Sequence, residues 1–153
     1  MKAVKLLGTI GLICSLCLLI GCTSNQDTSK NDRDVHFNTI STSDLDQSVS
    51  NQAKNSLSKL KGLTDINAIN TNKQLIVAFE TKQRKRLRLT KIQQDVQKKL
   101  ENEFPKWEVE VSTDKKLVLE TEKLEGKLSD NAISRKQLQQ KTNHLIKLMN
   151  EKT

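Results

Sequence analysis

Cysteine, glycine and aromatic residues are scarce in this chain. It holds three cysteines, five glycines and no tyrosine among 153 residues, and aromatic residues make up 3% of it. Cys14 and Cys17 lie in an apolar N-terminal run and no cysteine follows Cys22, which excludes a disulfide or a cysteine metal site beyond that position. With so few aromatic side chains, the core must be built from Leu, Ile and Val and will be small.

Signatures of catalysis and of metal or cofactor binding are also missing. The two histidines, His36 and His144, lack the clustered ligands that a metal needs. The glycines after position 21, Gly62 and Gly126, form no phosphate-binding loop. A Ser-x-x-Lys spacing at 56–59 falls in a Ser- and Lys-rich amphipathic segment, where chance explains it. We therefore expect no catalytic residue, no metal and no cofactor, and a protein that is not an enzyme.

The first 22 residues carry an export signal. Lys2 and Lys5 precede the uncharged run Leu6–Gly21, and the sequence Leu19-Ile20-Gly21-Cys22 has the form of a bacterial lipobox. We expect a signal peptidase to cleave between Gly21 and Cys22, and the Cys22 thiol to carry a diacylglyceryl group with fatty chains such as palmitate. The alternative is an uncleaved transmembrane anchor, but the run is shorter than the roughly 20 residues that a spanning helix needs.

Both interpretations place the rest of the chain outside the cytoplasm, and lipidation would hold it at the extracytoplasmic face of the cell membrane. Two of the 26 basic residues, Lys2 and Lys5, leave with the signal, so 24 remain against 18 acidic residues, a net charge of +6. This charge favours anionic partners such as phospholipid headgroups, wall polymers or nucleic acid.

Composition divides the chain into three parts. Residues 1–21 are the signal peptide, 22–42 are the lipidated cysteine and a flexible polar tether, and 43–153 are a folded domain. The tether is rich in Ser, Thr, Asn and Asp, so it buries too little apolar surface to offset the entropy lost on ordering. His36 and Phe37 are interpreted as tether residues with incidental contacts.

The predicted domain opens with a helix and a hairpin. The pattern Ser43-x-x-Asp46 resembles a capping box and predicts a helix that starts near Ser43, with Gly62 as its C′ residue. Strands are predicted at Leu63–Asn70 and Leu75–Phe79 with a turn between them. The second strand is a continuous apolar run and should be buried on both faces.

A second helix, a third strand and further helices follow. Apolar positions from Leu89 to Phe104 mark the buried face of the second helix, which Pro105 ends. The segment Trp107–Val111 alternates like a strand with one exposed face. Residues 115–125 fit either a strand or a helix, and their charged helix formers favour the helix.

The predicted element order defines the fold class. Gly126 is expected to break the helix over 115–125, and a last helix is predicted over about Ser134–Met149. The order is therefore α-β-β-α-β plus C-terminal helices. With its helices on one face of a three-stranded sheet, the domain is predicted to be α+β, a small two-layer sandwich.

Several segments resemble the YhcN/YlaJ-type sporulation lipoproteins of endospore-forming Gram-positive bacteria. Beside the lipobox and the polar tether, the likeness rests on Ala53–Leu60, on the apolar strand Leu75–Phe79, and on Val109–Asp114, and it covers about Ser48–Met149. The resemblance implies a membrane protein of the forespore or spore. It also implies a supporting role in germination or outgrowth and no known enzymatic activity.

The segment Lys82–Lys91 is the candidate binding site, because it holds six basic residues and no acidic residue. Each Lys or Arg close to an anionic leaflet contributes about 1 kcal/mol to binding. The alternative is a solvated run of charges without a dedicated partner. No aromatic residue is interleaved for base stacking, so we expect no nucleic-acid partner. The residues expected to bind an anionic surface are Arg84, Lys85, Arg86, Arg88 and Lys91.

Three hypotheses about function follow. The leading one is a lipid-anchored extracytoplasmic protein that acts as a non-enzymatic structural or interaction module, in sporulation or spore germination. The second is a basic domain that binds anionic lipid headgroups or cell-wall polymer. The third, an enzyme acting on the wall, rests on location alone.

Overall fold

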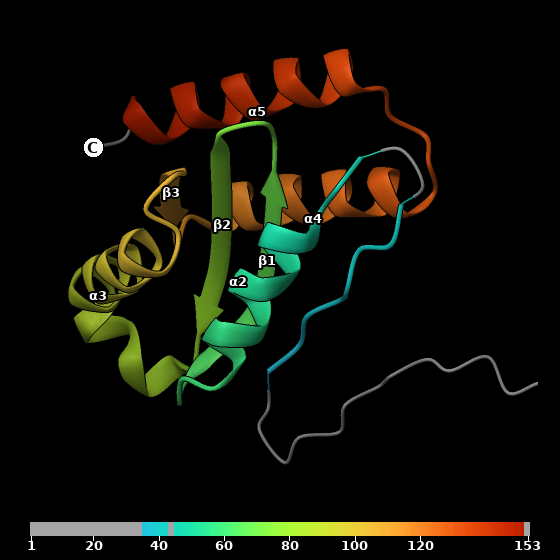
Figure 1. Ribbon diagram of the computed structural model, residues 1–153. Coiled ribbons are helices and arrows are strands. Elements are labelled where there is room, and N and C mark those ends of the chain that lie inside the picture. The colour runs from blue at the N-terminus through green and yellow to red at the C-terminus, as the bar shows by residue number, and fades with distance from the viewer. Residues whose placement is uncertain (1–34, 43–44, 152–153) are drawn as a thin grey trace, which may run out of the picture. The chain divides into compact units, whose positions relative to one another are not determined.

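The computed structural model describes residues 35–42 and 45–151, which lie within one compact unit. The predicted signal peptide, the lipidation site, the tether as far as residue 34 and the predicted helix start at Ser43 lie outside the described residues. The predicted α+β class and element order are confirmed (Figure 1). The elements are α2 (Ser48–Ser58), β1 (Leu63–Asn70), β2 (Gln74–Thr81), the 3₁₀ helix η1 (Gln83–Arg88), α3 (Leu89–Glu103), β3 (Glu108–Ser112), α4 (Lys115–Ser129) and α5 (Arg135–Asn150).

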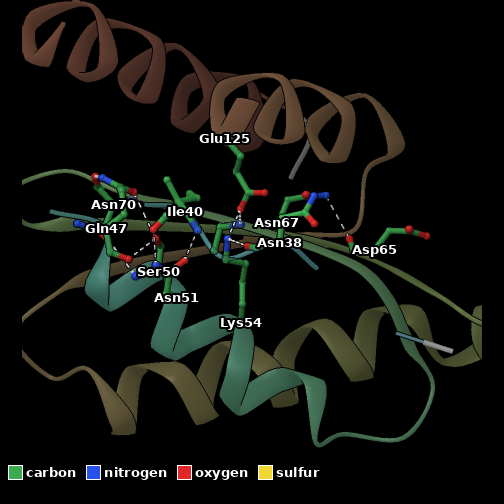
Figure 2. A network of polar contacts seen from close by, with 11 residues as sticks. Asn38, Ile40, Gln47, Ser50, Asn51, Lys54, Asp65, Asn67, Asn70 and Glu125 are labelled. Atoms are coloured by element: carbon green, nitrogen blue, oxygen red, sulfur yellow. Dashed lines mark hydrogen bonds and ion pairs between the residues drawn. The ribbon is translucent and has the colours of Figure 1, made fainter. Parts of the chain in front are cut away.

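The sheet has three strands in the order β1-β2-β3, with β2 in the centre. β1 and β2 form the predicted antiparallel hairpin, and β3 pairs with β2 in parallel. Helices cover both faces: α2 and α3 pack on one face and α4 and α5 on the other (Figure 2). The described domain therefore has three layers, and the predicted arrangement with helices on one face only is wrong.

The central strand explains why two helical layers are needed. Successive side chains of a strand point to opposite faces. Leu75, Val77 and Phe79 pack with α2 and α3, whereas Ile76 packs with α4 and α5, and all four are fully buried. A strand that is apolar on both faces requires cover on both faces, because either face left in water would expose apolar side chains.

Side chains and a loop satisfy the free edge of β1. The backbone N–H groups of Ile66, Ala68 and Asn70 donate away from β2. Their acceptors are the backbone oxygen of His36 at 2.9 Å, the Glu125 carboxylate at 2.7 Å and the Gln47 amide oxygen at 2.9 Å. The edge therefore offers these three donors to the protein itself and not to a second chain.

The opposite edge, on β3, is closed by two glutamines of α3. Gln93 and Gln97 lie four residues apart, so they share one face of the helix. Their amide nitrogens donate to the backbone oxygens of Val111 at 2.9 Å and Val109 at 2.6 Å.

Residues 35–42, predicted as the end of the tether, are packed on the domain. Ile40 is buried, and its backbone N–H and C=O both bond to the side-chain amide of Asn51, at 2.9 and 2.7 Å. Val35 and Phe37 pack against the core between α2, α3 and the sheet. Polar composition hid this packing, because three apolar residues and the backbone make most of the contacts.

The helix starts show both agreement and difference. α2 begins at Ser48, and the described residues before it, 45–47, are not helical, so the predicted earlier start is wrong. The Asp46 carboxylate accepts a hydrogen bond from the Ser48 backbone N–H at 2.8 Å, which lowers the pKa of Asp46. Residues 115–125 are helical, as favoured, and Asp114 caps α4 by accepting from the N–H groups of two following residues. Ser134 and Gln137 form a capping box at the start of α5.

The two glycines of the domain do not play their predicted roles. α4 continues through Gly126 to Ser129, so Gly126 does not break the helix. Gly62 follows the α2 C-cap, Lys59, by three residues and is not the C′ residue, although its φ of +95° does require a residue without a side chain.

These glycines predict opposite effects of the same substitution. Gly126→Ala should stabilise the protein by roughly 0.5–1 kcal/mol, because the position is helical and an added Cβ meets nothing within 4 Å. Gly62→Ala should destabilise it by about 1–2 kcal/mol or more, because φ is left-handed and the new Cβ would lie 2.6 Å from the Lys85 side chain. Urea denaturation of both variants checks the pair; equal effects would contradict the described backbone.

Candidate functional site

The basic segment forms η1 and the first turn of α3, directly after β2. The four basic residues predicted within 84–88 lie together on the six-residue η1, and Lys91 is the third residue of α3. All five predicted residues are exposed, and in the described part of the chain no ion pair holds Arg84, Arg86, Arg88 or Lys91. The structure therefore leaves these charges available to an anionic surface.

Lys85 differs from its neighbours because it also braces the segment. Its ammonium donates to the backbone oxygen of Lys61 at 2.7 Å, and its side chain lies over Gly62. The Lys82 backbone N–H donates to the Gly62 oxygen at 3.1 Å. These bonds fix η1 against the turn between α2 and β1.

Two residues of this surface escaped the sequence analysis. Lys61 is exposed and joins the basic segment through Lys85, a contact that only the β1–β2 pairing creates. Leu87 is 99% exposed although it is large and apolar. The sequence shows that Leu87 lies among arginines. The apolar pattern of the following helix, however, starts at Leu89 and does not indicate whether Leu87 is buried or exposed.

A buried ion pair forms the centre of one polar cluster in the described domain. The Lys54 ammonium of α2 lies 2.7 Å from the Glu125 carboxylate of α4, and their side chains are 0% and 6% exposed. Lys54 also donates to the Asn38 backbone oxygen, and the same Glu125 oxygen accepts from the Ala68 N–H at 2.7 Å. Figure 2 shows the two side chains meeting from opposite sides of the sheet.

Burial sets the protonation behaviour of this pair. Desolvation lowers the pKa of Lys54 and raises the pKa of Glu125, and in each case the charge of the partner opposes the shift. Because the groups are 2.7 Å apart and each has a further hydrogen bond, the ionised pair is held as a unit.

A second polar cluster joins the start of α2 to the end of β1. Gln47 and Asn70 exchange two hydrogen bonds, from the Gln47 amide to the Asn70 backbone oxygen at 2.8 Å and from the Asn70 N–H to the Gln47 amide oxygen at 2.9 Å. The Ser50 N–H donates to the Asn70 side chain at 3.0 Å. These groups satisfy a helix start and a strand edge, which is a structural role.

A hollow of about 570 Å³ adjoins this cluster, between the start of α2, the β1–β2 turn and α5. Among its described lining residues the one carboxylate is Asp46, which already accepts from Ser48. Within residues 35–42 and 45–151, no group of three or more His, Cys, Asp or Glu side chains is placed to hold a metal ion. In the same residues, no helix is both long enough and apolar enough to cross a bilayer.

Fold and comparison together define the class of this protein. The sporulation lipoprotein YhcN/YlaJ family matches residues 21–150, which is most of the chain and begins one residue before Cys22. The protein therefore belongs to this family, as its sequence resemblance predicted, and is a sporulation-related lipoprotein attached to a membrane through lipid. No match was found among the curated proteins or the solved structures.

The ion pair yields a stability prediction. Lys54→Met should cost about 3–5 kcal/mol near neutral pH, because it leaves the Glu125 carboxylate buried without its partner. The loss of stability should be smaller in acid. Without Lys54, the pKa of Glu125 in the folded protein rises further above its ordinary value of 4.5. The variant therefore loses more stability as the pH increases from 4.5 to that raised pKa. Urea denaturation at about pH 4 and pH 8 measures this.

The double variant Lys54→Met/Glu125→Gln is the control. It removes both charges and keeps an amide oxygen that can accept from the Ala68 N–H. It should recover most of the stability and lose the pH dependence of the single variant. A double variant as unstable as Lys54→Met would show that the cost does not come from an unpaired charge.

Proposed function

We propose that this protein is a lipid-anchored, non-enzymatic module at the extracytoplasmic face of the cell membrane, which supports sporulation or spore germination in a Gram-positive cell. The observation that carries the proposal is the family match over residues 21–150, which includes the Gly21-Cys22 junction. We place the module in the forespore or spore membrane.

The lipid attachment follows from the lipobox. Lys2 and Lys5, the apolar run to Gly21 and the cysteine after it are the elements of a lipoprotein signal. In the proposal the Cys22 thiol carries a diacylglyceryl group. Its two acyl chains suffice for stable attachment, whereas one chain alone gives marginal binding.

A structural or interaction role is supported by how the described polar clusters are used. The Lys54–Glu125 pair bonds to backbone groups of two other segments, and Gln47 and Asn70 bond to each other. Each of these clusters stabilises the fold and presents no activated nucleophile beside a general base. The exposed charges of the basic segment are then the candidates for contact with partners.

Replacement of the lipid-bearing cysteine tests the anchor. Cys22→Ala should abolish fatty-acid labelling of the protein and release it from the membrane or change its location, because the thiol that carries the acyl chains is gone. Metabolic labelling and membrane fractionation of sporulating cells measure both effects. Cys17→Ala is the control, since it changes a cysteine of the predicted signal and should leave labelling intact. Unchanged fractionation together with no labelled species in either strain would end the proposal.

The second candidate function is binding of an anionic surface by the basic segment. It is favoured by the exposure of Arg84, Arg86 and Arg88 on η1 and by the absence of acidic residues between Glu80 and Asp95. Attraction of this kind is strong for a domain already tethered near a membrane, and it weakens as salt screens it.

Charge reversal tests this binding. The triple variant Arg84→Glu/Arg86→Glu/Arg88→Glu should weaken binding of residues 23–153, without lipid, to phosphatidylglycerol vesicles at low salt by at least about tenfold. Vesicle co-sedimentation measures it. Lys85 is left in place, because it bonds to the Lys61 oxygen.

A matched variant distinguishes the effect of the basic segment on binding from the effect of the total net charge. It reverses three exposed lysines of α4 and α5, which changes the net charge equally: Lys115, Lys136 and Lys141. This variant should bind nearly as well as the unmodified chain. Equal loss in both variants would show that the total charge, and not the basic segment, decides binding.

A further inference from the structure

We propose that Leu87 is a membrane-inserting residue: with the arginines of η1 bound to anionic headgroups, its side chain enters the upper acyl region of the same bilayer. The inference rests on the second proposed function, binding of an anionic surface by the basic segment. It adds that the bound surface is a lipid bilayer and not a cell-wall polymer, and that Leu87 makes the apolar contact with it.

The exposure of Leu87 is the first observation. It is 99% exposed, whereas Leu119 of α4, the other large exposed hydrophobic residue in the described part, is 45% exposed. In a 3₁₀ helix, side chains three residues apart eclipse, so Leu87 shares a ridge with Arg84, and Arg86 and Arg88 flank it in sequence. A fully exposed leucine between cations matches the boundary between headgroups and acyl chains.

The position of η1 in the fold is the second observation. η1 begins two residues after Thr81, which pairs with Leu63, the first residue of β1. The first described residues meet β1 in its first half, which leads to this end of the sheet, since the His36 backbone oxygen accepts from Ile66, the fourth of the eight residues of β1 (Figure 1). The chain that leads from Cys22 therefore joins the domain in the half of β1 that is nearer to η1.

The length of that chain keeps the bilayer within reach. From Cys22 to Val35 the backbone advances thirteen residues, which extend to at most about 45 Å. A lipid on Cys22 therefore keeps the arginines of η1 within reach of the membrane surface.

The chemistry of Leu87 favours a bilayer over a wall polymer. A hydrated polyanion offers phosphate groups to arginine but no apolar medium to leucine, so Leu87 would stay in water. An anionic bilayer offers both. The segment is also held in place by the bonds from Lys85 to Lys61 and from Lys82 to Gly62, so insertion requires no rearrangement of η1.

Site-specific fluorescence tests the inference in the lipidated full chain. Leu87→Cys would be labelled with nitrobenzoxadiazole and the protein reconstituted into phosphatidylcholine vesicles with or without phosphatidylglycerol. Leu119→Cys is the matched control, a partly exposed leucine on α4. Nitroxide-bearing lipids in the same vesicles report the depth of each dye.

We expect the dye at position 87 to shift to the blue and to be quenched several-fold more than the dye at 119, in the anionic vesicles only. Arg84→Glu/Arg86→Glu/Arg88→Glu should remove the difference. Equal spectra at both positions would overturn insertion and leave headgroup binding to be judged by vesicle co-sedimentation. A shift at 87 caused by soluble polyglycerol phosphate without an anionic bilayer would overturn the bilayer as the bound surface.

Discussion

The arrangement of the described domain depends most on the buried ion pair between Lys54 and Glu125. The pair passes the outer edge of β1 and connects α2 on one face of the sheet with α4 on the other. An amide of β1 and a carbonyl of the segment 35–42 complete its hydrogen bonds. Because a lone buried charge is costly, none of these four segments can separate from the others without leaving desolvated polar groups behind.

Much of the fold could be predicted because its signals are local. Leu63–Asn70 has the predicted bounds, and the apolar run Leu75–Phe79 is the central strand. That run also implied cover on both faces, so the prediction of one helical layer conflicted with the sequence's own evidence. Gly126 was misjudged because a glycine inside a helix costs only about 1 kcal/mol, less than the packing of α4 returns.

The sites could be predicted only where charge is dense in sequence. The arginines of η1 were found because they are neighbours, whereas Lys54 and Glu125 lie 71 residues apart. Lys54 is the one charged residue of α2, and Glu125 belongs to α4, whose other charged residues are mostly exposed. Leu87 was missed although it lies among these arginines. An apolar residue just before a predicted helix suggests a buried side chain, and only the structure shows that this side chain is fully exposed.

Docking of residues 35–42 has a mechanical consequence. A pull transmitted along the chain from its lipid end meets the domain first at the backbone groups of three residues. That of His36 bonds to β1, that of Asn38 to the Lys54 ammonium, and that of Ile40 to the Asn51 side chain of α2. Force is therefore shared among several hydrogen bonds, one of them on the edge of β1 and the others on α2. A domain held in this way must lose several hydrogen bonds before its first described segment detaches, so we expect it to resist extension better than a domain suspended from the end of a helix.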